Sequence, residues 1–494
     1  MLAQRTGQFN RSAIDNRSTL LSGSALILFA DLLMIPTGLL TVALLTRWLG
    51  PEGYGLFALA ASLVAGIEWG LASILSRATI HGLSHASDWR SVARTLLGWH
   101  LVLAIAVLLM LWILAQPLAG LLREPALFSY VVLFACDLPF FLLAQAYRNM
   151  LTGRGQFAAR AFAGASRWLA RLVLIAIAVE AGLSIYAAIL ASIGASIVEL
   201  TIGRWALGPV GSKGTSDVAA LKRLALPLMI SAASIMLVSK MDLFLIKILG
   251  MPVEQAGVYA AAQNLSLLPG IFGQTVSAVL LSTLTRTKIE GQMGLFRQTA
   301  ARSLQAVFCL VPLAAVVAGG ASGIAVLCFG RAFEGAAPFV SLLMIGAVAQ
   351  VLIGMLMAIL TASGHLYWTV AIGSPLMLLA LLGHLWTIPI WGSFGAAWTT
   401  SGTMLVGTLF AYVVARSLDL TRLRFQSLTR ALLLGALGWG LATMWPTGTV
   451  WILLGLPGVA VLLVALYGWW EGLLGRAPLR GIWQLAERNA EEIS

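Results

Sequence analysis

Six ionisable side chains lie near the middle of long apolar stretches of this sequence. They are three carboxylic acids and three bases: Asp31, Glu68, Asp137, Arg167, Arg171 and Lys240. On scales of membrane insertion each such charge costs on the order of 2.5–3.5 kcal/mol, so these groups should face one another or a water-filled cavity. Clustered cations are suited to binding phosphate oxygens, and buried carboxylates are suited to pairing with cations or to carrying a proton.

The arginines are spaced so that they share one side of a helix. Arg160, Arg167 and Arg171 follow one another at intervals of seven and four residues, which is a helical spacing. Arg171 lies about 13 residues from the cytoplasmic end of its apolar stretch, or roughly 20 Å at 1.5 Å per residue. A side chain cannot reach the aqueous phase over that distance, so Arg171 needs a partner inside the protein.

A second group of charges lies in the stretch KMDLFLIKI, which begins at Lys240. Lys240 and Lys247 are seven residues apart and share one stripe of the predicted helix, whereas Asp242 points to another side. We predict that Arg167, Arg171 and Lys240 bind an anionic group, and we assign no catalytic residue and no metal ligand. The predicted cavity or ion-coupling carboxylates are Asp31, Glu68, Asp137 and Asp242.

The same charges also have a purely structural interpretation, in which carboxylates and bases form fixed ion pairs. For any one residue the structural and the functional interpretation are equally well supported, because structural ion pairs are common where charges are buried. For the whole set we favour a functional cavity, since so many buried charges would be costly as scaffolding alone. Glu199 lies nearer the cytoplasmic end of its apolar stretch, and we leave it outside the predicted site.

The composition is that of a multi-pass membrane protein. Of the 494 residues 60% are hydrophobic and only 10% are charged. We place about fourteen apolar stretches that are long enough to span a bilayer as helices, for example at 158–181, 366–391 and 394–416. The net charge of +12 does not indicate nucleic-acid binding, because the basic residues lie in short connections.

Those basic residues alternate along the chain in a way that predicts the orientation of the protein. Every second connection is rich in Arg and Lys, whereas the connections between them hold balanced charges, such as Arg123 with Glu124 and Lys247 with Glu254. The rule that basic loops stay inside then places both termini in the cytoplasm, which agrees with an even number of spans. We expect a bacterial cytoplasmic membrane as the location.

A repeated segment divides the chain into two related halves. LGPEGYGLFALA, which begins at Leu49, matches LGMPVEQAGVYAAA, which begins at Leu249, and each copy joins two apolar stretches. Such a duplication is typical of a transporter with its site between the halves. The predicted organisation is a six-helix lobe at 1–210, a cytoplasmic linker at 211–222, a second six-helix lobe at 223–424, and a further transmembrane helix pair with a cytoplasmic tail at 425–494.

Several motifs resemble those of one known family along nearly the whole chain. They are RWLGPEGYGLFALAASL from Arg47, LTGRGQF from Leu151, MDLFLIKILG from Met241, CFGRAFEGAAPFVSLLMIGAV from Cys328, ASGH from Ala362 and IPIWGSFGAAWTT from Ile388. The sequence resembles the polysaccharide and O-antigen flippases of the multidrug/oligosaccharidyl-lipid/polysaccharide (MOP) exporter superfamily. Each motif is weak by itself, and their order and spacing make the resemblance specific.

The resemblance implies an all-α protein whose two six-helix bundles form a V around a central cavity. It implies alternating access that moves a polyprenyl-diphosphate-linked oligosaccharide outward, with cationic residues holding the diphosphate, and Arg167, Arg171 and Lys240 fit that role. The carboxylates depart from this pattern, because they would repel a diphosphate unless paired or protonated. The last helix pair is similar to that of the fourteen-span members, which line a groove for a lipid tail with it.

We therefore predict a lipid-linked oligosaccharide flippase with no cofactor, driven by an ion gradient or by the membrane potential. Its expected partners are membrane lipid, the polyprenyl-diphosphate oligosaccharide and other polysaccharide-assembly proteins, and nucleic acid is excluded. One alternative is a cation-coupled multidrug exporter that uses the carboxylates. The other is a membrane enzyme that processes glycans, which would need a large outward loop that the sequence lacks.

Overall fold

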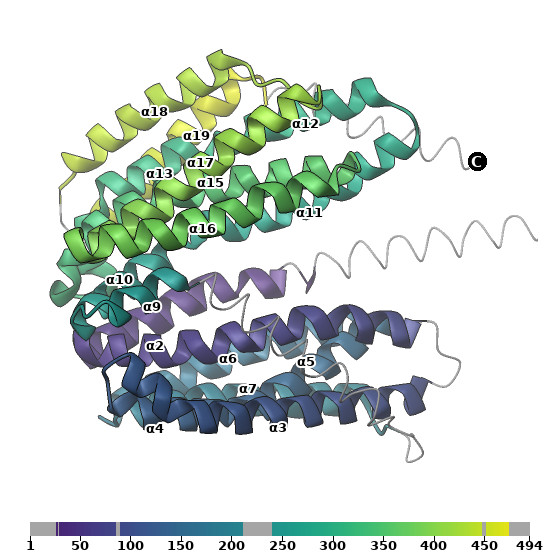
Figure 1. Ribbon diagram of the computed structural model, residues 1–494, viewed down its shortest axis with the longest axis vertical. Coiled ribbons are helices and arrows are strands. Elements are labelled where there is room, and N and C mark those ends of the chain that lie inside the picture. The colour runs from purple at the N-terminus through teal and green to yellow at the C-terminus, as the bar shows by residue number, and fades with distance from the viewer. Residues whose placement is uncertain (1–25, 28, 85–88, 211–239, 447–450, 474–494) are drawn as a thin grey trace, which may run out of the picture. The chain divides into compact units, whose positions relative to one another are not determined.

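The computed structural model describes most of the chain, namely residues 26–27, 29–84, 89–210, 240–446 and 451–473 (Figure 1). Every regular element in these ranges is a helix, and nine of the helices described are long and apolar enough to cross a membrane. The predicted all-α, multi-pass membrane fold is confirmed. The predicted number of about fourteen spans stays a prediction, because much of the stretch before Lys240 lies outside the described residues.

The chain divides into two compact units, Met1–Gly257 and Val258–Ser494. We call them unit 1 and unit 2. The linker predicted at 211–222 lies outside the described residues, so the domain boundaries taken from the sequence stay predictions.

Unit 1 is a helix bundle with α5 at its centre. Its helices are α2 (Met34–Ser84), α3 (Trp89–Leu121), α4 (Ala126–Ala135), α5 (Asp137–Gly153), α6 (Phe157–Glu180), α7 (Ile185–Leu207), α9 (Met241–Ile248) and the first part of α10 (Val253–Ser266). Helix α5 contacts α2, α3 and α7, and α6 packs against both α2 and α7. Helix α2 consists of two helices joined at Gly50, whose φ of 66° lies in the left-handed region that glycine adopts readily.

Unit 2 is built around α15. Its elements are α11 (Leu268–Ile289), α12 (Met293–Val307), α13 (Leu310–Gly319), α14 (Ala321–Phe329), η1 (Arg331–Ala336), α15 (Ala337–Ala362), α16 (Leu366–Trp391), α17 (Ser393–Ser417), α18 (Phe425–Thr443), η2 (Trp451–Gly455) and α19 (Leu456–Trp470). Helix α15 packs against α11, α13 and α17, and both helices of the predicted last pair, α18 and α19, contact α13.

Prolines account for three interruptions within apolar stretches. Helices α4 and α5 are separated at Cys136, three residues before Pro139, and α12 and α13 are separated just before Pro312. The break between α10 and α11 likewise precedes Pro269. Proline has no backbone N–H and its ring clashes with the carbonyl four residues earlier, so the preceding helix ends there. The break at Cys136 places Asp137 at the first position of α5.

The two copies of the repeated segment contact each other within unit 1. A side chain at Gly257 would overlap the backbone of Pro51 and Gly55, and one at Gly55 would overlap the backbone of Val253 and Gly257. Only glycine allows backbones to approach so closely.

An ion pair lies next to these two copies and joins α9 to the connection after α3. Lys247 Nζ lies 2.6 Å from Glu124 Oε1 and also donates a hydrogen bond to the carbonyl of Met251. Both charged side chains are largely buried. This ion pair holds the end of α9 against the connection after α3.

Candidate functional site

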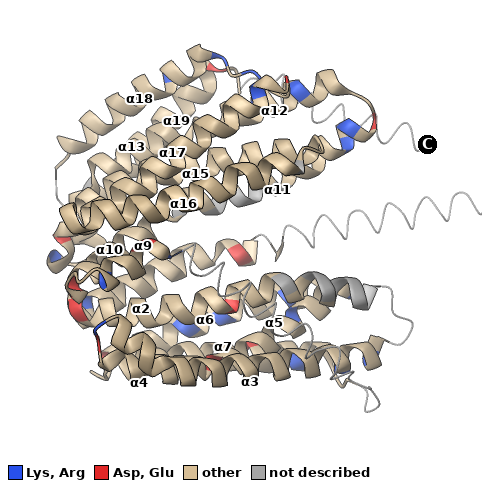
Figure 2. Ribbon diagram, in the orientation of Figure 1, with Lys and Arg blue, Asp and Glu red and all other residues tan. Residues whose placement is uncertain are grey.

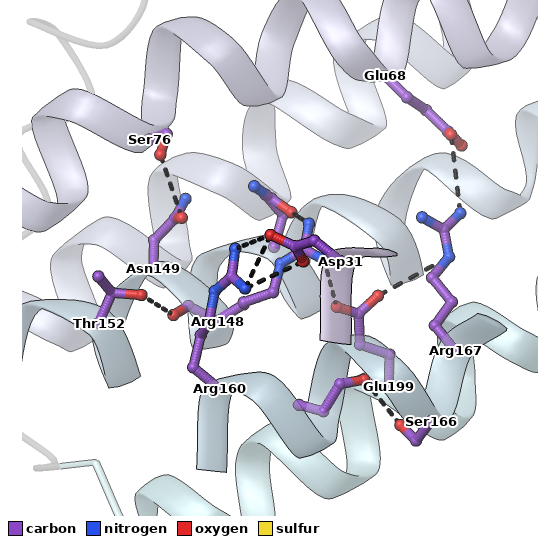
Figure 3. Close-up of polar contacts among 12 residues, drawn as sticks. Asp31, Glu68, Ser76, Arg148, Asn149, Thr152, Arg160, Ser166, Arg167 and Glu199 are labelled. Atoms are coloured by element: carbon purple, nitrogen blue, oxygen red, sulfur yellow. Dashed lines mark hydrogen bonds and ion pairs between the residues drawn. The ribbon is translucent and has the colours of Figure 1, made fainter. Parts of the chain in front are cut away.

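Unit 1 contains a group of buried charges that comes from four helices. The ionic cluster, as we name it, consists of Glu68 from α2, Asp137 and Arg148 from α5, Arg167 and Arg171 from α6, and Glu199 from α7. Figure 3 shows four of its members, Glu68, Arg148, Arg167 and Glu199. The pairwise packing of these four helices brings the side chains together. Unit 2 differs, because α15 and α16 contain no Asp, Glu, Lys or Arg (Figure 2).

Arg167 connects three carboxylates. Its Nη2 atom lies 4.0 Å from Glu68 Oε2 and 4.0 Å from Asp137 Oδ2, and its Nε atom lies 3.8 Å from Glu199 Oε2. The guanidinium also lies 4.3 Å from the centre of the Phe141 ring, which is a cation–π contact. Arg167 is therefore held from several sides, and its charge is shared among the acids of α2, α5 and α7.

Glu199 has a second partner. Arg148 Nη1 lies 3.2 Å from Glu199 Oε1, and Arg148 also donates a hydrogen bond to Gln145 on the same helix. The Arg148 guanidinium also lies beside α6, where a Cβ added at Gly164 would be in ordinary van der Waals contact with Nη1, at 3.6 Å.

Asp31 and Arg160 form a separate pair next to the ionic cluster. Arg160 Nη1 donates hydrogen bonds to both carboxylate oxygens of Asp31, at 3.0 and 3.1 Å, and Nη2 donates a third at 3.2 Å. The side chain of Asp31 is 47% exposed, so it is not a deeply buried charge. With this pair included, four carboxylates and four arginines lie in the region, and their formal charges balance.

Arg171 is the member of the cluster whose charge is least compensated. In the described part of the chain no carboxylate lies within 4.0 Å of its guanidinium, and its buried Nε atom has no hydrogen-bond partner. The charged groups that act on it are Arg167, Asp137 and Glu68. Among the described residues Glu68 Oε1 and Asp137 Oδ1 are also buried without a hydrogen-bond partner. Buried polar atoms left over in this way call for water, a proton or a ligand.

Lys240 and Asp242 lie at the start of α9. Asp242 is buried and accepts a hydrogen bond of 2.8 Å from the backbone N–H of Leu243. Asp242 is also the carboxylate whose charge acts on Lys240, although the helical spacing places the two on different sides. The backbone of Lys240 is not helical, with φ −130° and ψ 18°, so the spacing rule does not hold at this residue.

The structure thus brings Arg167 and Arg171 together with Glu68 and Asp137, whereas Asp31 pairs with Arg160 instead. That Arg167, Arg171 and Lys240 share one anion-binding site stays a prediction. Sequence reasoning left Arg148 and Glu199 outside the site. The signal for Glu199 was that it is the one carboxylate within an otherwise uncharged stretch of α7 before Arg204.

The chain matches the model of one protein family, described as polysaccharide biosynthesis protein, over residues 20–288. This match covers more than half of the sequence and includes every residue of the ionic cluster. No curated protein sequence matches the chain.

Solved structures share the fold. The lipid II flippase MurJ in an inward closed conformation superposes with a TM-score of 0.73 at 12% sequence identity, over 92% of this chain and 100% of that chain. An inward-facing multidrug resistance MATE family transporter of the MOP superfamily gives a TM-score of 0.59 at 15% identity, over 83% and 95% of the two chains. The Vibrio cholerae MATE transporter VcmN gives 0.52 at 18% identity, over 82% and 98%.

Proposed function

We propose that this chain, which belongs to the polysaccharide biosynthesis protein family of the MOP superfamily, is a flippase for a polyprenyl-diphosphate-linked oligosaccharide. The substrate would cross a bacterial cytoplasmic membrane from the inner to the outer leaflet. The family, the multi-pass helical fold and the buried ionic cluster support transport rather than catalysis. Structures of the same fold in inward-facing and outward-facing forms support alternating access as the mechanism.

The observation that carries the proposal is that Arg171 has no carboxylate within ion-pair distance in the described structure. Three of the four arginines in the region have a carboxylate within 4.0 Å, and Arg171 has none among the described residues. A diphosphate brings two or more negative charges into the membrane, and a guanidinium binds phosphate oxygens through two parallel hydrogen bonds. Arg171 is therefore the residue to which an arriving diphosphate would bind first.

Arg167 would join the site when its carboxylates are neutralised. While Glu68 and Asp137 are ionised, the Arg167 guanidinium is engaged with them. Protonation of either acid releases part of that attraction, so that Arg167 can turn toward the diphosphate beside Arg171. In this proposal the acids hold the cations in place without substrate and take up a proton when substrate binds. The coupling of a proton to the anion follows from the charge balance of the cluster.

The membrane potential also favours the proposed direction of transport. Moving one elementary charge across the membrane is worth about 2.3 kcal/mol per 100 mV. A diphosphate with two negative charges would gain roughly 4–5 kcal/mol per 100 mV on leaving an interior that is negative. Each proton that travels outward with the substrate cancels one unit of this gain.

The test combines loss of the gene with one substitution. We expect that deletion in the host abolishes surface polysaccharide and leaves the lipid-linked repeat unit in the inner leaflet. Arg171→Ala should fail to restore export at wild-type abundance, and Arg171→Lys should restore it in part because the two-pronged geometry is lost. Arg422→Ala is the matched control, because Arg422 is exposed and pairs with Asp419 far from the cluster in sequence. Normal export by Arg171→Ala would refute the proposed site.

A cation-coupled multidrug exporter is the second candidate. It is favoured by the unpartnered carboxylate atoms of Glu68 and Asp137 in the described structure, since such atoms could bind a cationic drug. It predicts that drug resistance depends on Glu68 and persists in Arg171→Ala. The flippase hypothesis instead predicts that polysaccharide export is reduced more by Arg171→Ala than by substitution of Glu68. Resistance to cationic drugs in cells that carry Arg171→Ala would favour this candidate.

A further inference from the structure

A groove on unit 1 has features of a lipid-binding site, and none of its lining residues belongs to the ionic cluster. It has a volume of about 570 Å³, within the range of small-molecule sites. Ten residues line it, five from α3, two from α5 and three from α7: Arg94, Thr95, Leu97, Gly98, Leu101, Leu143, Tyr147, Leu200, Thr201 and Arg204. Helix α5 packs against both α3 and α7, so that it forms the floor and the other two form the walls.

The lining changes from polar to apolar along the helices. Arg94 lies near the start of α3 and Arg204 near the end of α7, and these two ends meet at the side of unit 1 that the charge pattern predicts to be cytoplasmic. Leu101 lies seven residues further along α3 than Arg94, which is roughly 10 Å deeper at 1.5 Å per residue. The groove therefore offers two guanidinium groups at head-group depth and leucines below them.

The groove is formed by the fold itself rather than by mobile surface side chains. Tyr147 on its floor belongs to a buried hydrophobic cluster with Ala146, Met150 and Leu151, and Leu97 and Leu200 pack against that cluster. The side chains at the mouth are different, because Arg94, Thr201 and Arg204 are exposed. A ligand would thus meet a firm apolar floor and accessible polar groups at one end.

Its charge is positive. None of the described residues that line the groove is acidic, and two are arginines. Within the described part of the chain Arg204 forms no ion pair. Helices α5 and α7 present other residues, such as Arg148 and Glu199, to the ionic cluster, so that the two sites use different sides of the same helices.

We propose that this groove binds one anionic phospholipid of the cytoplasmic leaflet. The phosphate would lie between the guanidinium groups of Arg94 and Arg204, and an acyl chain would run over the leucines. Guanidinium groups are the preferred partners of phosphate, and apolar side chains at greater depth match the acyl region of the bilayer. The site requires the membrane-spanning fold and its orientation, and it does not depend on the flippase activity.

The test measures lipid binding to the purified full-length protein in detergent. Native mass spectrometry would follow titrations with phosphatidylglycerol and, in parallel, with zwitterionic phosphatidylcholine. We expect one tight phosphatidylglycerol site in the wild type and no site of equal affinity for phosphatidylcholine. The double variant Arg94→Ala with Arg204→Ala should lose at least about tenfold in phosphatidylglycerol affinity, because two charge-assisted contacts are removed. Arg90→Ala is the matched control, since Arg90 is exposed one turn before Arg94 on α3 and does not line the groove.

A second variant separates loss of binding from misfolding. Leu101→Trp fills the groove at a position that is 39% exposed, and it leaves both arginines in place. It should also weaken phosphatidylglycerol binding and keep the thermal stability of the wild type. Wild-type affinity in both the double variant and Leu101→Trp would overturn the proposal, as would equal affinities for the two phospholipids. Displacement of phosphatidylglycerol by undecaprenyl diphosphate at tenfold lower concentration would also overturn it, because the groove would then serve the substrate.

Discussion

Arg171→Ala and Arg167→Ala should affect different properties, although the two arginines are neighbours on α6. Arg167→Ala should mainly lower stability, and Arg171→Ala should mainly lower substrate affinity. Arg167 lies within 4.0 Å of three carboxylates, and Arg171 lies within that distance of none in the described structure. Removing one partner of a buried ion pair leaves an uncompensated charge and typically costs 3–5 kcal/mol, so Arg167→Ala should destabilise the protein by about that amount. Removing Arg171 breaks no ion pair, and the balance of the remaining charges can be restored by one proton on Glu68 or Asp137.

Substrate affinity should instead fall more in Arg171→Ala than in Arg167→Ala. A charge-assisted contact is worth about 1.5–3 kcal/mol, and 1.4 kcal/mol corresponds to a factor of ten in affinity. Arg171→Ala should therefore weaken the binding of undecaprenyl diphosphate by about 10-fold to 150-fold. Undecaprenol, which has no phosphate, serves as the matched ligand and should bind the variant and the wild type alike.

Two measurements on purified protein separate stability from binding. Thermal unfolding in detergent should show a lower transition temperature for Arg167→Ala and one close to wild type for Arg171→Ala. Titration with undecaprenyl diphosphate, followed by quenching of tryptophan fluorescence, should show the loss of affinity for Arg171→Ala. If Arg171→Ala instead unfolds as early as Arg167→Ala and binds the diphosphate as the wild type does, then Arg171 is a structural residue and the reasoning is wrong.

Three further predictions follow from the charge pattern and the packing. In a background without the native cysteines, Gln292→Cys should react with an impermeant thiol reagent only after lysis, and Glu334→Cys should react in intact cells; the reverse result would invert the topology. Gly257→Ala should cost about 3 kcal/mol of stability and reduce the yield of folded protein, because the new Cβ overlaps the backbone of the first repeat copy. Gly120→Ala, where a Cβ meets no atom within 4 Å, should keep the wild-type yield, and equal yields would show that the repeat contact is dispensable. Tyr467→Phe removes a 2.9 Å hydrogen bond to a carbonyl of α12 and should lower stability by about 1 kcal/mol, measured by thermal unfolding. An unchanged transition temperature would show that this hydrogen bond does not contribute to holding α19 against α12.

The helices could be predicted from the sequence because the bilayer sets their length. The stretches predicted at 366–391 and 394–416 correspond to α16 at Leu366–Trp391 and α17 at Ser393–Ser417. Runs of about 20 apolar residues separated by glycine or by charge leave few alternatives in a membrane. The prediction of a buried charged site also rested on a strong physical constraint, the cost of a charge at mid-span.

The partners of the charges could not be predicted in the same way. Asp31 belongs to Arg160, and Glu199 belongs to both Arg148 and Arg167, because the rotation of each helix and its choice of neighbour decide which side chains meet. Periodicity gives the face that residues share on one helix, and it does not say which helix that face meets. Arg148 illustrates the limit, since nothing in its own segment of the sequence indicates Glu199 as its partner, and the fold places the two side chains 3.2 Å apart.

The kinds of polar group in the two units support a division of roles between them. In unit 2, partly buried hydroxyls of α17 are already satisfied by backbone carbonyls of α15, as in the bonds from Ser401 to Leu342 and from Thr408 to Ala349, at 2.7 and 2.9 Å. Such groups fasten helices together, and they would have to break those bonds before they could bind anything else. In unit 1 the balanced ionic cluster keeps buried polar atoms without hydrogen-bond partners in the described structure, so it can accept a proton or an anion without first giving up a bond. The chemistry of binding and coupling is therefore expected in unit 1, with α15 and α17 providing an apolar, firmly packed frame in unit 2.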